Sequence, residues 1–501
     1  MSRRSGAALT ALTTLAVVSM LAAGCMAGPA YRPDQVIAPE QRIGAPLLSD
    51  SARRFFDSLA VARARDTVRT VPGMRVTLTD ASMSAVAWMD ILRDSTLVRL
   101  VDTAIRQNRD LRVAFARIDE FRAGVGLARS PLLPNLSVNA SEGSNQVALG
   151  AFPPTSFRAT RVTGDLAWEL DFWGRVRRGV EAANADLGAQ EAAQRATLLS
   201  LVSDVASGYL QLLELDQEQA IAERTLSSRK ATLEIARQRF AQGLTSELDV
   251  RQFEAQVATP AVTFVQAERA LSQTERSLNV LLGEGPSPIP RGLSLANAVA
   301  ALAVPDSVSA FLLTRRPDVV QAERTYAASV ARIGVADAAR FPTFNIVGSY
   351  GTQAGTPDRA FTAQTRVYQA LIGFSFPVFD NGKVASVSAA ARARAEQARA
   401  SYEGVALNAL REANDALVAV HTTRDEALAL ATQANAFRQA LDLATVRYQA
   451  GLSTYLDLLD AQRSLFGAEL AMSQAQLAEL TAGVQLYKAL GGSWVTPATR
   501  R

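Results

Sequence analysis

The sequence predicts a mainly α-helical protein with a small β-barrel part: a long α-helical coiled-coil tunnel plus four membrane strands per protomer, closing as a trimeric 12-stranded β-barrel. Three observations support this fold class. The 501-residue chain repeats one pattern after 208 positions, each copy contains a long stretch without proline, and each copy contains two segments in which apolar and polar residues alternate. The first observation gives the organisation of the chain, and the other two give its helices and strands.

The duplication is clearest at two turn motifs, RFAQGLTSELD at Arg239–Asp249 and RYQAGLSTYLD at Arg447–Asp457. The same separation of 208 residues relates Asp110 to Asp318, Gly126 to Gly334, Pro134 to Pro342 and Gly174 to Gly382. A period this long indicates a duplicated half-domain, not the short units of a solenoid. We therefore expect a first structural repeat over residues 88–283, a linker or equatorial region over 284–315, a second structural repeat over 316–491 and a polar C-terminal tail over 492–501.

The amino terminus carries a secretory signal. Two arginines precede an apolar run over residues 7–23, which is too short and wrongly flanked for a membrane-spanning helix. The sequence LAAGC at Leu21–Cys25 resembles a bacterial lipobox. That resemblance implies a signal peptide over residues 1–24, cleavage before Cys25 and lipid attachment to Cys25. Met26 stands where an aspartate would resemble an inner-membrane retention signal, which favours the outer membrane.

The first part of the mature chain lacks a helical or strand period. Residues 25–87 are rich in proline and arginine, so we expect a lipidated N-terminal segment that follows the surface and contributes to the equatorial region. The stretch 51–80 is expected to be an added equatorial segment. Apolar residues spaced by three and four then begin near Trp88, and we expect an incoming helix over Gln107–Arg129, which two prolines stop.

Two pairs of strands are expected from alternation with period two. In the first copy the apolar residues are Leu136, Val138 and Ala140, then Val162, Leu166, Trp168 and Leu170; in the second they are Phe344, Ile346 and Tyr350, then Ile372, Phe374 and Phe376. Strands of about ten residues can cross a hydrocarbon core at the tilt of a barrel. Half-buried strands of a soluble protein would show the same alternation, but the lipobox favours the membrane.

Four strands cannot close a membrane barrel, because the smallest bacterial barrels have eight. An open sheet edge is not tolerated in lipid. We therefore expect a homotrimer whose strands close together, with polar strand faces lining the lumen.

The long helices follow the strands. Residues 175–242 and 383–450 contain no proline, which predicts helices about 100 Å long at 1.5 Å per residue, packed as coiled coils. Gly243 and Gly451 are expected to end them in tight turns, because glycine adopts left-handed backbone angles at little cost. A return helix is expected over Ser246–Leu282, with a kink or fraying at Pro260.

Three motifs carry a family resemblance. They are WELDFWGRVR at Trp168–Arg177, RRPDV at Arg315–Val319 and GLSTYLDLLDAQRSLF at Gly451–Phe466. The chain resembles the outer-membrane factor efflux family of TolC and OprM type, especially its lipoprotein, NodT-like branch. The resemblance implies a passive exit duct in the cell outer membrane, lipid-anchored, with a helical tunnel in the periplasm. It also implies two partners, a periplasmic adaptor (membrane fusion) protein and an inner-membrane transporter of RND type.

The resemblance further implies site residues. The channel constriction falls on Asp457 and Asp460, which lie at i and i+3 on one helical face and would form a ring of six carboxylates in a trimer. Helix-dipole chemistry alone would favour a solvated helix N-terminus at these positions. The closed-state latch falls on Tyr448 and Asp249, while the position of its partner arginine is Ser453, with Arg447 close by. The adaptor-contact tips are Gly243, Leu244, Ser246, Gly451, Leu452 and Ser453.

Other classes of function receive little support from the sequence. His421 is the only histidine and lies mid-helix, where we interpret it as a surface residue; there is no phosphate-binding glycine loop and no metal-ligand cluster. We expect no catalytic residue, no cofactor and no metal. Basic and acidic residues, 52 and 48, alternate without a basic patch, which argues against nucleic acid as a partner.

Alternatives remain within and outside the duct class. Type I protein secretion and metal-ion efflux use the same scaffold, and the absence of a methionine cluster favours small molecules over copper. A non-conducting, periplasm-spanning structural lipoprotein would explain the long helices and the lipid, but not the paired strands. Conductance distinguishes this tether from a duct.

Overall fold

The structure is a computed structural model that describes residues 26–32, 36, 42–44, 94–147, 155–301 and 307–492. The expected signal peptide, Cys25, the stretch 51–80 and nearly all of the polar tail lie outside these residues. The helices are α5 (Ser95–Gln107), α6 (Arg109–Arg129), α7 (Arg175–Ala241), α8 (Glu247–Leu282), α9 (Leu295–Ala301), α10 (Pro317–Ala338), α11 (Lys383–Gln449) and α12 (Tyr455–Ala489). The strands are β1 (Arg42–Gly44), β2 (Asn135–Val147), β3 (Thr155–Leu170), β4 (Ser307–Ser309), β5 (Thr343–Ala354) and β6 (Arg366–Ser375).

The described residues form two compact units. The sheet unit contains residues 26–32, 116–192 and 320–404, and the hairpin unit contains 94–115, 193–301, 307–319 and 405–492 with the short β1 segment. In the hairpin unit β1 pairs antiparallel with β4, a contact between distant segments that the sequence did not predict. The prediction of a mainly helical chain with four long strands is confirmed.

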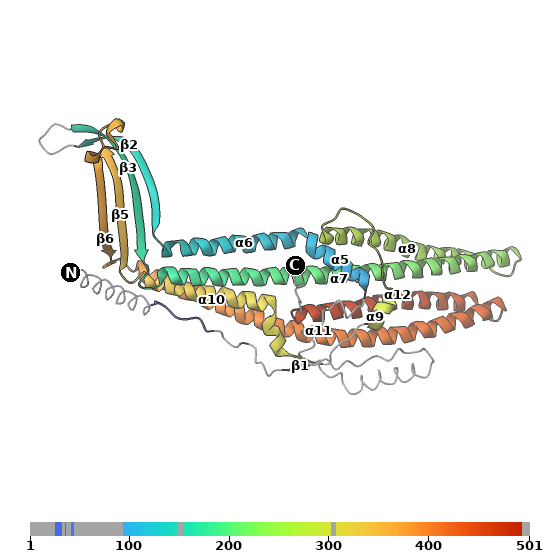
Figure 1. The fold of residues 1–501 in the computed structure, drawn as a ribbon. Helices are drawn as coiled ribbons and strands as arrows, with labels where there is room; N and C mark the ends of the chain where they lie inside the picture. The colour runs from blue at the N-terminus through green and yellow to red at the C-terminus, as the bar shows by residue number, and fades with distance from the viewer. Residues whose placement is uncertain are drawn as a thin grey trace. The chain divides into compact units, whose positions relative to one another are not determined.

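The four long strands form one antiparallel sheet in the order β2-β3-β5-β6, as Figure 1 shows. Because residues opposite each other in a ladder share a face, the register sorts the side chains into two sets. One face carries Leu136, Val138, Leu166, Trp168, Phe344, Ile346, Tyr350, Tyr368, Ile372 and Phe374. The other carries Asn135, Ser137, Asn139, Thr163, Asp165, Glu169, Asn345, Ser349, Gln369 and Ser375.

The apolar face is open to its surroundings. Val138 is 79% exposed, Ile372 77% and Phe374 74%. A soluble half-buried sheet would cover these side chains, so the exposure favours lipid as the environment of this face. The first hairpin is longer than the expected ten residues, with 13 residues in β2 and 16 in β3, and β6 ends one residue before Phe376.

The long helices α7 and α11 have 67 residues each and confirm the prediction from the proline-free stretches. Each begins after a glycine with positive φ, Gly174 at 77° and Gly382 at 79°. A carboxylate then caps the first turn, which leaves backbone N–H groups without helical partners. Asp171 accepts hydrogen bonds from the amides of Val176 and Arg177, and Asp380 accepts one from Val384 at 2.8 Å.

The incoming helix α6 begins at Arg109, two residues after the expected start at Gln107. The helical spacing that begins near Trp88 is interrupted at Asn108, between α5 and α6. Asn108 Nδ2 donates to the Leu281 carbonyl at 2.9 Å, and its Oδ1 accepts from Leu111 N. The Asn108 side chain therefore caps the start of α6 and also satisfies a backbone carbonyl at the end of α8.

An equivalent joint occurs 208 residues later. Arg316 Nη1 donates to the Ala489 carbonyl at 2.9 Å, at positions equivalent to Asn108 and Leu281. At each joint a left-handed glycine lets the segments approach, because a Cβ on Gly283 would lie 2.5 Å from the Gln107 carbonyl oxygen and one on Gly491 3.1 Å from Arg316 Cα. The two copies thus use the same joint, with a neutral side chain in one and a cation in the other.

α8 runs unbroken from Glu247 to Leu282, so the helix does not fray at Pro260. Proline has no N–H, so the carbonyl of Gln256, four residues earlier, loses its helical donor. Arg229 Nη1 of α7 donates to that carbonyl at 2.7 Å and replaces the missing bond. Pro260 itself is buried.

Arg229 is 1% exposed and its charge is costly to bury. Burial, and then the nearby charge of Arg463, lower the pKa of the Arg229 guanidinium. Its carbon Cζ lies 5.3 Å from the ring centroid of Phe466, while Nε and Nη2 make no hydrogen bond. The hydrogen bond to the Gln256 carbonyl and the cation–π contact with Phe466 offset part of the free-energy cost of burying this charge.

We predict energetic coupling between Arg229 and Pro260. Arg229→Met leaves the Gln256 carbonyl without a donor, but in a Pro260→Ala background the restored amide of residue 260 can bond that carbonyl. The loss of stability caused by Arg229→Met should therefore be smaller by about 1–2 kcal/mol in the Pro260→Ala background. Denaturant unfolding of the four proteins in detergent measures this difference, and an equal loss in both backgrounds would refute the replacement of the missing bond.

A buried carboxylate joins three parts of the hairpin unit. Asp94 caps α5 by accepting from Thr96 N at 2.8 Å, and its Oδ2 accepts from the Tyr209 hydroxyl at 2.7 Å and from Leu293 N at 3.1 Å. The Tyr209 oxygen accepts in turn from Gly292 N at 2.8 Å. Burial and the bond to Asp94 raise the pKa of Tyr209, so the phenol remains a donor. This network lies within the largest hydrophobic core, where α5, α7 and α8 meet.

Candidate functional site

The two predicted turns have the same backbone geometry. α7 ends at Ala241 and α11 at Gln449, and Gly243 and Gly451 follow with φ of 74° and 73°. In each turn the residue after the glycine donates its amide to a carbonyl five residues back, Leu244 to Arg239 at 2.9 Å and Leu452 to Arg447 at 2.8 Å. These bonds satisfy the free carbonyls at the helix ends.

The tips present leucines to the surroundings. Leu244 is 63% exposed and Leu452 71%, and a Cβ on either turn glycine would meet nothing within 4 Å. Ser246 caps α8, while the Ser453 hydroxyl is buried and makes no hydrogen bond. Paired exposed leucines on turns with no covering side chain are typical of a contact surface for another protein.

Asp457 and Asp460 lie at the start of α12 and are both exposed. Asp457 Oδ2 accepts from the amide and the hydroxyl of Thr454, each at 3.1 Å, in a capping box. The equivalent box in the first copy joins Ser246 and Asp249. Asp457 therefore caps the start of α12, as helix-dipole chemistry predicts. The cap uses only Oδ2, so Oδ1 of Asp457 and the side chain of Asp460 take no part in it.

Tyr448 lies at the latch position but contacts an arginine that sequence reasoning missed. Tyr448 is 5% exposed, its carbonyl accepts from Arg239 Nη1 at 3.2 Å, and the Arg239 Cζ lies 5.0 Å from its ring centroid. This contact ties the end of α7 to the end of α11. Arg239 opens the first turn motif as Arg447 opens the second, and that equivalence was the available signal.

Asp249 lies in the same tip region and serves mainly as a cap. It accepts from the Thr245 hydroxyl and from Ser246 N, and these bonds lower the pKa of its carboxyl. Burial raises the pKa of Tyr448; the charge of Arg239 opposes the rise, and that of Asp249 adds to it. Arg239 is therefore the cation beside Tyr448.

The polar face of the sheet carries a hydrogen-bonded network. Asp165 Oδ2 accepts from Asn139 Nδ2 at 2.6 Å and from the Thr163 hydroxyl at 3.1 Å. Near the end of β3, Glu169 forms a bidentate ion pair with Arg175, with bonds of 2.9 and 2.6 Å. Charged groups held in this way suit a face in contact with water.

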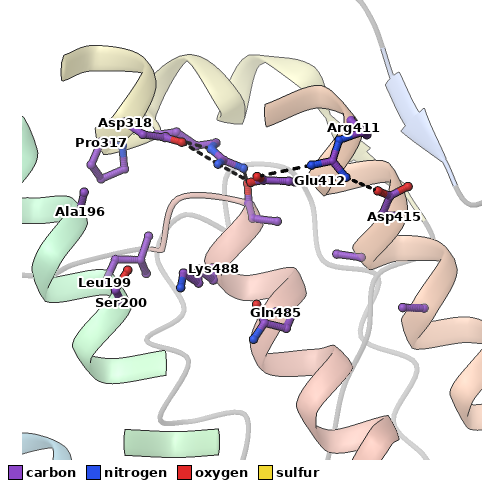
Figure 2. A pocket seen from close by; sticks show the side chains of 14 residues that line it. Ala196, Leu199, Ser200, Pro317, Asp318, Arg411, Glu412, Asp415, Gln485 and Lys488 are labelled. Atoms are coloured by element: carbon purple, nitrogen blue, oxygen red, sulfur yellow. Dashed lines mark hydrogen bonds and ion pairs between the residues drawn. The ribbon is translucent and has the colours of Figure 1, made fainter. Parts of the chain in front are cut away.

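A cavity of about 560 Å³ lies in the hairpin unit between α7, α11 and α12. Figure 2 shows Asp318, Glu412 and Arg411 along its upper edge. Arg316 donates to Asp318 and to Glu412, each at 2.7 Å. Burial alone would raise the pKa of Asp318, but the hydrogen bond and charge of Arg316 lower it. The RRPDV motif is thus an ion-paired joint between helices.

Two further observations concern the chemistry of the chain. In the described residues no group of three or more histidine, cysteine, aspartate or glutamate side chains is placed to hold a metal ion. His421, which we interpreted as a surface residue, is half-buried, and its Nε2 makes no hydrogen bond. The mid-helix position gave no sign of this, because burial depends on which helix packs beside it.

Comparison with known proteins agrees with these features. The family described as outer membrane efflux protein matches residues 100–284 and 309–492. Outer membrane protein OprJ of Pseudomonas aeruginosa is 34% identical over 425 residues, 83% of this chain and 88% of that protein. The antibiotic efflux pump outer membrane protein ArpC of Pseudomonas putida is 31% identical over 490 residues, 96% of each. The open state of the MtrE outer membrane channel of Neisseria gonorrhoeae matches with a TM-score of 0.78 at 28% identity, covering 94% of this chain and 98% of that chain.

Proposed function

Because this chain belongs to the outer membrane efflux protein family and is a non-enzymatic outer-membrane efflux channel, we propose that it serves as the exit duct of a tripartite system. The partners are a periplasmic adaptor protein and an inner-membrane transporter of RND type. The cargo is small molecules, including drugs, as the printed name of ArpC says of that relative. The observation that carries the proposal is the sheet with one exposed apolar face and one polar face.

The duct is a homotrimer. In the four-stranded sheet β2 and β6 are the edge strands, and their outer backbone groups need partners in lipid. Three copies supply twelve strands, with β2 of one protomer beside β6 of the next, apolar faces toward lipid and polar faces toward the lumen. Single-channel conductance in a planar bilayer tests this duct directly, because a tether without a lumen conducts nothing.

We assign two roles to the tips, which are closure of the duct and contact with the adaptor protein. Asp457 and Asp460 form the constriction, and the latch uses Tyr448 and Asp249 together with Arg239, whose contacts with Tyr448 support this role. The exposed leucines of the two turns support an adaptor-contact surface made of Gly243, Leu244, Ser246, Gly451, Leu452 and Ser453. The equivalent joints at Asn108 and Arg316 support the proposed repeats over residues 88–283 and 316–491, linked by 284–315 and flanked by the segment 25–87 and the tail 492–501.

We place the chain in the lipoprotein branch, with Cys25 as the anchor after removal of residues 1–24. The LAAGC sequence and the absence of any other cysteine support this assignment. Two acyl chains or more on one residue give a stable membrane anchor, since a single chain binds only marginally.

We predict that Cys25→Ser abolishes acylation. Cells grown with labelled palmitate should incorporate label into the wild-type protein and none into the variant, because serine lacks the thiol that accepts lipid. Met26→Ser, one residue later, serves as the control and should keep the label. Label retained by Cys25→Ser would refute the anchor.

A further inference from the structure

Arg229 uses only one edge of its guanidinium group within the hairpin unit. Its Nη1 donates to the Gln256 carbonyl at 2.7 Å and to the Gln256 side-chain Oε1 at 3.3 Å. The other edge carries Nε and Nη2, and both are buried without a hydrogen bond to any described residue. Because Arg229 is 1% exposed, bulk water does not reach this edge. Donors of a charged group that stay unsatisfied in an interior are costly, so the edge calls for a partner.

The free edge of Arg229 has the geometry of an anion-binding group. The N–H bonds of Nε and Nη2 lie parallel in one plane, and this fork is the part of arginine that binds carboxylates and other anions with two hydrogen bonds. The Phe466 ring lies over the guanidinium, with its centroid 5.3 Å from Cζ. A ligand would therefore lie in the plane of the group, against the free edge.

The charge of Arg229 is not balanced by a carboxylate. Burial and the charge of Arg463 on α12 lower the pKa of Arg229, and no carboxylate of the described residues opposes them. Arg463 itself is exposed. Two cations are thus close enough to repel each other where α7 and α12 pack, and an anion placed there would be attracted by both.

A second buried polar group lies one helical turn away. Gln462 precedes Phe466 by one turn on α12, and its Nε2 donates at 3.2 Å to the hydroxyl of Thr232, which follows Arg229 by one turn on α7. Gln462 is 6% exposed, and its Oε1 makes no hydrogen bond to the described residues. A half-turn of this amide would let Oε1 accept from the Thr232 hydroxyl and leave Nε2 to donate to a bound anion.

The duplication of the chain does not account for the buried charge. The residue 208 positions after Arg229 is Phe437, so the second copy carries an aromatic ring where the first carries a cation. The missing amide of Pro260 explains the bond from Arg229 Nη1 to the Gln256 carbonyl. A neutral donor would serve that purpose equally well, and it would leave no second edge to satisfy.

We propose that the free edge of Arg229, together with Arg463 and Gln462, binds a small inorganic anion, chloride in ordinary salt, between α7, α8 and α12. A monatomic halide is favoured over a molecule with a carboxylate or phosphate group, because the larger ligand would displace packed side chains around a residue that is 1% exposed. The halide neutralises the buried charge and joins α12 to α7. The inference depends neither on the duct, nor on the trimer, nor on acylation.

Crystals of the full-length, detergent-extracted protein grown in sodium bromide test the site directly, because bromide replaces chloride and scatters anomalously at its absorption edge. We expect an anomalous peak within hydrogen-bonding distance of Arg229 Nε and Nη2. Density there without an anomalous signal would be a water molecule, and it would overturn the anion. A map with no density beside this edge would overturn it as well.

Unfolding in solution tests the same ion without a crystal lattice. The urea midpoint of the wild type should be higher in potassium chloride than in potassium gluconate at equal ionic strength, because a ligand of the folded state stabilises that state. The difference should vanish in the double variant Arg229→Met/Pro260→Ala. It should persist in Pro260→Ala alone, which separates the charged edge from the bond to the Gln256 carbonyl.

Two single substitutions at exposed arginines complete the test. Arg463→Gln removes the second positive charge and should raise the chloride concentration for half-maximal stabilisation at least about threefold. Arg237→Met is the matched control, because Arg237 lies further along α7 and pairs with Glu254 at 3.0 Å, and it should leave that concentration unchanged. A wild-type midpoint that is the same in chloride and gluconate would overturn the site, and so would a chloride effect that survives in Arg229→Met/Pro260→Ala.

Discussion

Replacing both Asp457 and Asp460 with asparagine should reduce the cation preference of the channel at least about threefold, measured as the permeability ratio in a salt gradient. In a trimer the two substitutions remove six carboxylates from the constriction. Asparagine is preferable to alanine because Asp457 also accepts from the Thr454 amide and hydroxyl. The amide oxygen of asparagine can still accept these hydrogen bonds. Alanine would remove the cap and cost about 1 kcal/mol of helix stability, so a change in gating could then come from fraying of α12 instead of from the lost charge.

The first copy supplies a control for this prediction. Gln252 occupies the position equivalent to Asp460, so Gln252→Ala changes the same turn of helix without changing charge. It should leave the permeability ratio unaltered. If the double asparagine variant conducted with unchanged selectivity, the two aspartates would not form the constriction, and their role would be that of an ordinary helix start.

Asp94→Ala should lower the free energy of unfolding by about 3–5 kcal/mol, the largest loss we expect from a single substitution in the hairpin unit. The change removes the cap of α5 and the acceptor for the Tyr209 hydroxyl and the Leu293 amide. Those donors stay in a core where Tyr209 is 1% exposed, so water does not replace the carboxylate. The denaturant midpoint of the detergent-extracted protein measures the loss.

An exposed aspartate on the same helix provides the comparison. Asp102 forms an i,i+4 ion pair with Arg106, and both side chains are more than half exposed. Asp102→Ala should change stability by no more than about 0.5 kcal/mol. Similar losses in the two variants would mean that the Asp94 network contributes no more than a surface ion pair.

The sequence predicted the elements whose signals are periodic. The proline-free stretches gave α7 and α11 closely, and the alternation of Leu136 with Ser137 gave the correct faces of a sheet, because side-chain direction follows strand parity. The turns at Gly243 and Gly451 were also predictable, since a left-handed residue is needed at both.

The remaining features depend on partners that no period reveals. The break at Asn108 exists because its side chain reaches the Leu281 carbonyl, and α8 continues through Pro260, where Arg229 donates to the Gln256 carbonyl. Arg239 was missed as the partner of Tyr448 because the two lie 209 positions apart. Such contacts are set by which helices pack together, and a pattern within one helix cannot report them.

A gated duct should conduct ions. Single-channel conductance of the purified, detergent-extracted protein in a planar bilayer, together with its oligomer mass, shows whether the chain forms one. We expect a trimer with small, cation-selective openings, because twelve strands would enclose a polar lumen that the proposed constriction narrows. A folded protein that is monomeric and gives no current would show that the chain does not form a duct. The chain would then be a structural lipoprotein that spans the periplasm without conducting, and Asp457 and Asp460 would not form a ring of carboxylates around a channel.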